Sequence, residues 1–121
     1  MAVTGIGGIF FRAKDPQGLN AWYAKYFGVN DMHVNYEPWL QQEGPTVFAL
    51  FSDDDHECFG DVSQQFMLNF RVDNLEELVG QLKSDKVKIV KEIENQEGVG
   101  HFASIEDPEG NRIELWEPSE E

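Results

Sequence analysis

The sequence predicts an α+β fold built from two similar halves, and three observations lead to it. Apolar residues recur at helical spacing in two segments, 16–27 and 74–84. Short runs rich in β-branched and aromatic residues flank both helices. The strand and helix that open the first half return in the second half at one constant offset, where Asp15 matches Asn74. Each half is therefore expected to read strand, helix, then two or three further strands.

The first helix is expected over residues 16–27. Its apolar stripe consists of Leu19, Trp22, Tyr23, Tyr26 and Phe27. Asp15 suits the N-cap, Pro16 suits the first turn, and Gly28 suits the left-handed residue that ends a helix.

The second helix is expected to start at Asn74, with Glu77 as its capping-box partner, and to end near Ser84. Its apolar stripe consists of Leu75, Leu78, Val79 and Leu82.

Strands are expected over residues 8–13, 46–51, 66–72, 87–93, 101–106 and 112–116. The sequence Asp-Pro-Glu-Gly-Asn at 107–111 is a strong turn signal, so the last two strands should form a hairpin. Residues 30–44 are ambiguous, with a candidate short strand at 32–36. Residues 52–63 read as an exposed loop that links the two halves.

Composition limits the partners and the location. The chain has 121 residues and a formal net charge of −14, which repels phosphate backbones and anionic membrane surfaces. No apolar run approaches the roughly 20 residues of a membrane helix. Neither nucleic acid nor a membrane is therefore expected as a partner. The single cysteine, Cys58, cannot form an internal disulfide, so a reducing cytoplasm is the expected location.

Three segments together carry a family resemblance: residues 11–16 leading to Trp22-Tyr23 and Phe27-Gly28, residues 70–75, and residues 107–115. This pattern resembles the vicinal oxygen chelate superfamily, which includes glyoxalases, bleomycin-resistance proteins and extradiol dioxygenases. The resemblance implies one domain of two tandem βαβββ modules, at about residues 5–55 and 64–118. It also implies that each module is a cupped mixed sheet backed by a helix, with a ligand site inside the cup.

Strand alternation selects the residues that face this cup. The ligand-binding candidates are Phe10, Arg12, Phe51, Met67, Asn69, Arg71 and Trp116. Strand 101–106 has no decisive alternation, so Phe102 and Ser104 remain candidate lining residues. Apolar walls with a few polar groups are the usual composition of a small-molecule site. The same residues could instead be strand ends in solvent and core aromatics.

Glu114 is the candidate catalytic residue. Its neighbours Ile113 and Leu115 must face the core, which turns Glu114 into the cup. An ionised carboxylate among aromatic side chains is costly without a partner. Pairing with Arg12 or Arg71 would make Glu114 structural, whereas an unpaired Glu114 would be a candidate general base.

Metal-dependent members of the superfamily place four ligands at equivalent positions of the two modules, which read Gly8, Ala49, Met67 and Glu114 here. Glu114 is the one hard-cation ligand among them, and a methionine thioether is too soft for such a site. A catalytic zinc keeps about three protein ligands. Neither a metal nor another cofactor is therefore expected.

The histidines do not offer a substitute site. His33, His56 and His101 lack the close spacing of a chelating pair. They are interpreted as exposed or capping residues.

Three functions stay open at this point. The first is a metal-free protein that binds an aromatic or amphipathic small molecule, similar to the bleomycin-resistance branch. The alternative is a lyase or isomerase, similar to lactoylglutathione lyase, that uses Glu114 as a base or as its sole retained metal ligand. The third is a module whose partner is another protein. A homodimer is expected, because exposed aromatic surface such as Trp39 favours self-association.

Overall fold

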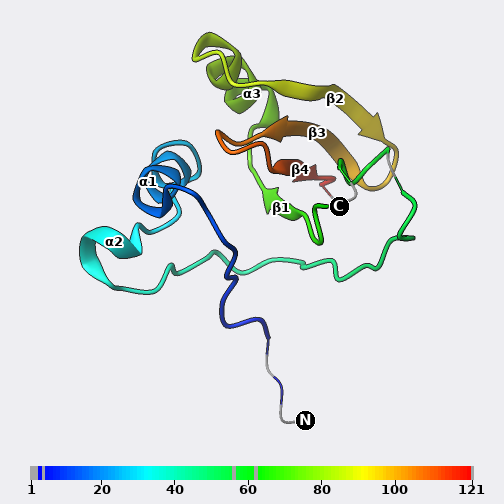
Figure 1. Cartoon of the computed structure of the whole chain (residues 1–121). Helices are drawn as coiled ribbons and strands as arrows, with labels where there is room; N and C mark the ends of the chain where they lie inside the picture. The colour runs from blue at the N-terminus through cyan, green and yellow to red at the C-terminus, as the bar shows by residue number, and fades with distance from the viewer. Residues whose placement is uncertain (1–2, 4, 56, 62, 121) are drawn as a thin grey trace. The chain divides into compact units, whose positions relative to one another are not determined.

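A computed structural model describes residues 3, 5–55, 57–61 and 63–120 (Figure 1). The chain divides into two compact units, Met1–Trp39 and Leu40–Glu121. The first unit holds the helices α1 and α2, and the second holds β1, α3, β2, β3 and β4 in that order. None of the helices in the described part of the chain has the length and apolar character that a membrane crossing needs.

Helix α1 spans Pro16–Phe27, which confirms the prediction for this segment. The Asp15 side chain caps its first turn, and Gly28 ends it with the left-handed backbone angle φ 68°. The Tyr23 side chain is buried, and its ring meets the Phe11 ring edge-on with 6.2 Å between centroids. The segment before α1 thus contacts the helix through Phe11.

Helix α2 is a single turn over Met32–Asn35, where the sequence analysis expected a short strand over residues 32–36. The Asp31 carboxylate accepts a hydrogen bond from the His33 amide at 2.9 Å and so caps the turn. Tyr36 then adopts the left-handed conformation at φ 59° and ends it. The local capping hydrogen bonds outweigh the strand preference of this short segment.

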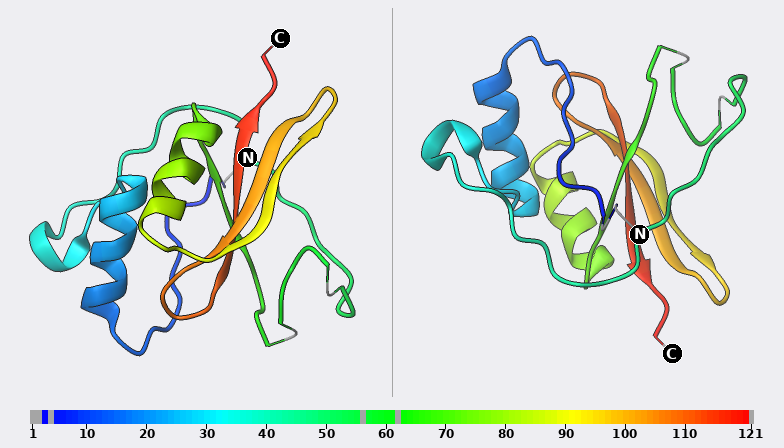
Figure 2. Two further views of the ribbon diagram at one scale, coloured as in Figure 1. Left: turned by 90° about the horizontal axis from the view of Figure 1, so that it is seen from above. Right: turned by 90° about the horizontal axis from the view of Figure 1, so that it is seen from below.

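The second unit contains one sheet of four strands in the order β1-β4-β3-β2. The strands are β1 Leu68–Arg71, β2 Ile89–Gln96, β3 Gly100–Glu106 and β4 Arg112–Pro118. β1 runs parallel to β4, and the other neighbours are antiparallel. β1 and β2 are consequently the two edges of the sheet (Figure 2). These strands confirm the four expected in the second half to within a few residues.

Helix α3, Leu75–Ser84, packs against one face of this sheet (Figure 2). The buried core of the unit consists of Leu75, Val79 and Leu82 from α3 and of Ala103, Ile105, Ile113 and Leu115 from β3 and β4. The Asn74 side chain caps α3, as predicted. The Glu117 carboxylate of β4 accepts a second hydrogen bond from the Leu75 amide at 2.8 Å, which ties the helix start to the sheet.

The hairpin between β3 and β4 is also confirmed. Asp107 is 4% exposed, and its carboxylate accepts hydrogen bonds from the amides of Glu109 and Asn111. Gly110 follows with φ 86°, a conformation that suits glycine. The Asp side chain thus closes the turn that sets the register of the two strands.

The strands expected over residues 8–13 and 46–51 are not formed, so the described residues contain one sheet instead of two. The expectation of two tandem strand-forming modules is therefore not met in this structure. A strand persists only where a neighbouring strand takes up its backbone hydrogen bonds, and neither segment pairs. The side chains of Phe10, Phe48 and Leu50 are 90%, 83% and 88% exposed. The repeat thus holds for the two helices and their caps but not for the strands of the first half.

Candidate functional site

The two faces of the sheet differ in what they present. On the face covered by α3, the β4 residues Ile113 and Leu115 are buried. Because side chains alternate along a strand, Glu114 and Trp116 point to the opposite face, here called the open face. Paired residues on neighbouring strands point the same way, so the strand register defines which side chains share this face.

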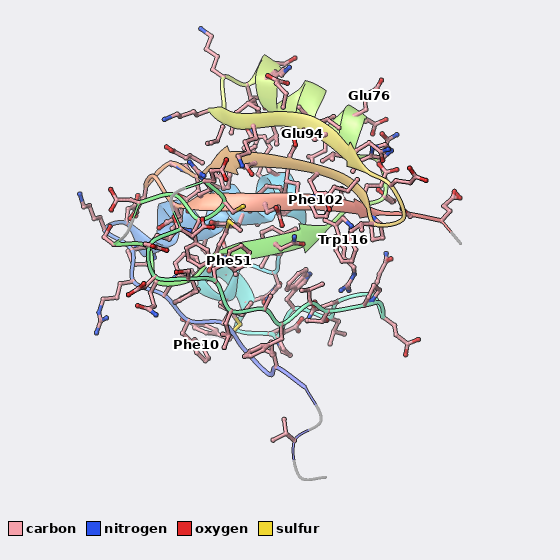
Figure 3. All side chains as sticks on the ribbon, turned by 90° about the vertical axis from the view of Figure 1, so that its right-hand side faces the viewer. Phe10, Phe51, Glu76, Glu94, Phe102 and Trp116 are labelled. Carbon is pink, nitrogen blue, oxygen red and sulfur yellow. The ribbon has the colours of Figure 1, made fainter. Side chains whose placement is uncertain are left out.

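The register arranges the open face in two rows that cross all four strands. The polar row consists of Asn69, Glu114, Ser104 and Lys91, from β1 through β4 and β3 to β2. The aromatic row consists of Arg71, Trp116, Phe102 and Glu94 in the same strand order. Figure 3 shows three members of the aromatic row, Trp116, Phe102 and Glu94, on their strands.

The centre of the aromatic row is a stacked pair of rings. Phe102 and Trp116 lie with 6.1 Å between ring centroids and 5° between ring planes, an offset-stacked geometry. Both side chains are half-buried. The indole Nε1 of Trp116 donates a hydrogen bond to the Val99 carbonyl at 3.0 Å, which fixes the orientation of the larger ring. The pair therefore places two parallel aromatic rings, one of them held by a hydrogen bond, on the open face.

The polar row holds an oriented carboxylate. The side-chain amide of Asn69 donates a hydrogen bond to Glu114 Oε1 at 2.6 Å. Glu114 is half-buried, and beside it Ser104 is only 5% exposed. No hydrogen bond or ion pair within the described residues involves Glu114 Oε2. One oxygen of the carboxylate is thus held in place, and the other remains available to accept a hydrogen bond.

Arg71 does not pair with Glu114, so the second of the two ion pairs expected as alternatives for Glu114, with Arg12 or with Arg71, is not formed. Its guanidinium donates hydrogen bonds to the carbonyl oxygens of Gln42, at 2.9 Å, and of Pro45. A Cβ atom on Gly44 would lie 2.8 Å from Arg71 Nε, so the guanidinium lies close against the backbone of this segment. Arg71 holds segment 42–45, and the partner of Glu114 is the neutral amide of Asn69.

The other predicted binding residues do not all join the open face. Met67 is half-buried immediately before β1. Phe51 is 47% exposed and stacks at a tilt against Phe59, with 5.5 Å between ring centroids. Phe10 and Arg12 are exposed residues of the first unit. Of the predicted set, the sheet brings together Asn69, Arg71, Glu114 and Trp116.

Two members of the rows, Lys91 and Glu94, were not anticipated from the sequence. Their strand contains two register shifts, one between Ile89 and Lys91 and one between Lys91 and Glu94. Each irregularity changes which side of the strand the next residue faces, so simple alternation fails here. The alternation of the neighbouring β3, fixed by its pairing with β4, is what assigns both residues to the open face.

The donor set of the open face does not fit a catalytic metal. Glu114 is the one carboxylate of the polar row, and its neighbours in that row are the neutral side chains of Asn69 and Ser104. Within the described residues, no group of three or more His, Cys, Asp or Glu side chains could hold a metal ion. His33 lies in α2 and His101 in β3, while His56 lies outside the described residues.

Comparisons with known proteins agree on the fold. Residues 5–115 match the family model of the Glyoxalase/Bleomycin resistance protein/Dioxygenase superfamily. A similar solved structure is TnmS3, an antibiotic binding protein from Streptomyces sp. CB03234, with TM-score 0.63, 18% identity, and coverage of 98% of this chain and 99% of that chain. Another is lactoylglutathione lyase from Agrobacterium tumefaciens, with TM-score 0.58, 17% identity and coverage of 97% and 96%. No curated protein matches the sequence.

Proposed function

The chain belongs to the Glyoxalase/Bleomycin resistance protein/Dioxygenase superfamily, and we propose that it binds a planar aromatic small molecule on the open face of its sheet. The stacked pair of Phe102 and Trp116 is the observation that carries this proposal. Family membership alone does not select a function, because one fold serves many chemistries. The proposal therefore rests on the chemistry of the open face.

Two parallel aromatic rings favour a flat ligand, which can stack on the outer face of either ring. Each aromatic ring stacked on a protein side chain contributes about 1–3 kcal/mol to binding, as measured by alanine substitution for nucleobases. The hydrogen bond from the Trp116 indole to Val99 orients the ring before the ligand arrives, which lowers the entropy cost of binding. The polar row beside the rings supplies the few hydrogen-bonding groups that orient a ligand. An antibiotic binding protein with a similar fold supports a small molecule as the partner.

A titration with acridine, a neutral planar tricycle at pH 7.5, tests this function. Replacing Trp116 with alanine should weaken binding by about tenfold or more through the loss of one stacking surface. Phe102→Leu keeps an apolar side chain of similar volume and removes the aromatic face, so it separates stacking from folding. Glu76→Gln in α3, the helix that packs against the opposite face of the sheet, is the control and should leave the affinity unchanged. Equal affinity in the wild type and both open-face variants would overturn the proposal.

A second candidate function is proton transfer by Glu114. The hydrogen bond from Asn69 to Oε1 holds the carboxylate in one orientation, and Oε2 has no hydrogen-bond partner in the described part of the chain. Such an oxygen can take a proton from a substrate stacked on Trp116. Lactoylglutathione lyase activity that disappears in Glu114→Gln, without loss of aromatic binding, would favour this function over binding alone.

The proposed assembly is a homodimer, and the proposed location is the cytoplasm. Both units expose large apolar side chains, among them Phe10 in the first and Phe48 and Leu50 in the second. Exposed apolar side chains of this size favour burial against a partner, and we assign that role to a second copy of the chain. The free thiol of Cys58 is consistent with a reducing compartment. A sedimentation mass that stays at 13.8 kDa across a wide concentration range would refute the dimer.

A further inference from the structure

We propose that the aromatic ligand is cationic, and that Glu114 Oε2 determines this specificity by accepting a hydrogen bond from a charged nitrogen on the ligand ring. This inference rests on the proposed aromatic-binding function and adds the charge of the ligand to it. Three features of the open face support it. They are the hydrogen bonding of Glu114, the hydrogen bonds that Arg71 makes to the backbone, and the charges of the residues near the two rings.

One carboxylate oxygen of Glu114 can accept a hydrogen bond from the ligand. Its Oε1 accepts the Asn69 amide at 2.6 Å, and its Oε2 has no partner among the described residues. The side chain is half-buried, which makes an ionised carboxylate a stronger attractor than it is in bulk water. Hydrogen bonds between charged groups are roughly twice as strong as those between neutral groups. A cationic N–H donor is therefore the best complement to this oxygen.

The distance between Glu114 and the rings suits one compact ligand. Glu114 and Trp116 are separated by one residue on β4 and point to the same face. Residues in this relation lie about 7 Å apart along a strand. A tricyclic ring stacked on Trp116 can carry a substituent that reaches this far. A single ligand can thus contact both the aromatic row and the polar row.

An anionic group would find a poorer partner on this face. Arg71, the cation next to Trp116 in the aromatic row, is held toward segment 42–45 by hydrogen bonds to two backbone carbonyls, and so it is not directed at Glu114. Lys91 lies two strands away from Glu114 across Ser104, about 10 Å distant at ordinary strand spacing. At the far end of the aromatic row, Glu94 pairs with Phe102 and adds a second carboxylate. The net charge of −14 also opposes the approach of an anion.

Three acridines that differ only at one ring position test the inference by isothermal titration at physiological salt. They are 9-aminoacridine, which is cationic, acridine, which is neutral, and acridine-9-carboxylate, which is anionic. The wild type should bind 9-aminoacridine about tenfold more tightly than acridine, and more tightly still than the carboxylate. Glu114→Gln keeps an oxygen for Asn69 and removes the charge. It should abolish the tenfold preference for 9-aminoacridine over acridine.

A matched control separates a local contact from general attraction to an acidic protein. Glu76 is an exposed residue of α3, on the other side of the sheet from the open face (Figure 3). Glu76→Gln removes the same charge and should keep the preference for 9-aminoacridine. If Glu76→Gln lowers that preference as much as Glu114→Gln does, the contact with Glu114 is overturned.

The remaining outcomes separate this inference from the function on which it rests. If all three acridines bind equally, and Phe102→Leu weakens all of them, aromatic binding stands and the cationic specificity is overturned. Tighter binding of acridine-9-carboxylate would overturn it in the same way. If none of the three binds, or if Phe102→Leu has no effect on any of them, the proposed function itself is overturned.

Discussion

Residues 64–118 bury five large side chains almost completely, whereas residues 5–55 leave some of their largest apolar side chains in solvent. Leu82, Ile105 and Leu115 are 0% exposed, while Phe10 and Leu50 are 90% and 88% exposed. Both regions nevertheless form their expected helix with the expected cap. The difference lies in the strands, which pair in residues 64–118 and do not pair in residues 5–55.

This difference separates local from non-local folding signals. A helix satisfies its backbone within one segment, so Asp15 and Asn74 each suffice to start one. A strand depends on a partner that is distant in sequence, as β1 depends on β4. The comparison predicts that core substitutions act strongly in one region and weakly in the other, while cap substitutions act alike in both.

The largest contrast is expected between Leu115→Ala and Leu50→Ala. Leu115 is fully buried beneath α3, so its truncation should lower the free energy of unfolding by about 2–5 kcal/mol. Leu50 is 88% exposed, so the same truncation there should change it by no more than about 0.5 kcal/mol. Urea unfolding followed by circular dichroism measures both. A large loss in Leu50→Ala would mean that segment 46–51 is buried in solution.

A smaller contrast is expected between two glycines of the β2–β3 hairpin. A Cβ on Gly100 would lie 2.2 Å from the Glu117 carbonyl oxygen, and the backbone is at φ 133°. Gly100→Ala should therefore destabilise by roughly 2–3 kcal/mol, since strain and a backbone clash add. Gly98 has φ 80° and open space around it, so Gly98→Ala should cost about 1 kcal/mol. Equal thermal shifts for the two variants would contradict the close packing of β3 on β4.

The two helix caps should behave alike. Asp15→Ala removes the acceptor for the Gly18 amide, and Asn74→Ala removes the acceptor for the Glu77 amide. Each change should cost its helix about 1 kcal/mol. Hydrogen exchange of the first-turn amides in α1 and α3 measures the loss of stability of each helix separately. A cost confined to one of the helices would show that the helices of the two regions do not form by the same local signal.

The smallest effect concerns metal. The positions that the family resemblance assigns to metal ligands carry Gly8 and Ala49 in one region and Met67 and Glu114 in the other, which would offer a hard cation a single carboxylate. Zinc, nickel, manganese or magnesium should therefore not raise the melting temperature. Binding at 100 times the dissociation constant would add about 2.7 kcal/mol, so a real site would be visible in differential scanning fluorimetry. A saturable rise that vanishes in Glu114→Ala would contradict the expectation.

Much of the fold could be predicted because its signals are local or periodic. The caps at Asp15 and Asn74 and the turn at Asp107 are short motifs in which a side chain accepts hydrogen bonds from nearby backbone amides, so each motif indicates one local structure. The alternation of Ile113, Glu114 and Leu115 predicted which side of β4 faces the core, and burial agrees with it. The predictions were wrong in two segments. A strand was expected over residues 46–51, but it needs a neighbouring strand to pair with. A strand was also expected over residues 32–36, where the Asp31 cap favours a helical turn.

The candidate site was predictable where strands are regular and was not where they are irregular. Alternation selected Glu114, Trp116, Asn69 and Arg71, which the register places on one face. It could not show that the Arg71 guanidinium is occupied by the backbone at residues 42–45, because that contact is set by the path of a loop. It also missed Lys91 and Glu94, whose orientation depends on bulges in β2.

The most direct measurement is a proton–nitrogen correlation spectrum recorded during an acridine titration. The Trp116 indole N–H donates to Val99 and gives a signal separate from those of Trp22 and Trp39. Stacking on the open face should shift the Trp116 indole signal and the side-chain amide signal of Asn69 in one saturable transition. Shifts at Trp22 or Trp39, with the Trp116 signal unmoved, would contradict binding on the open face.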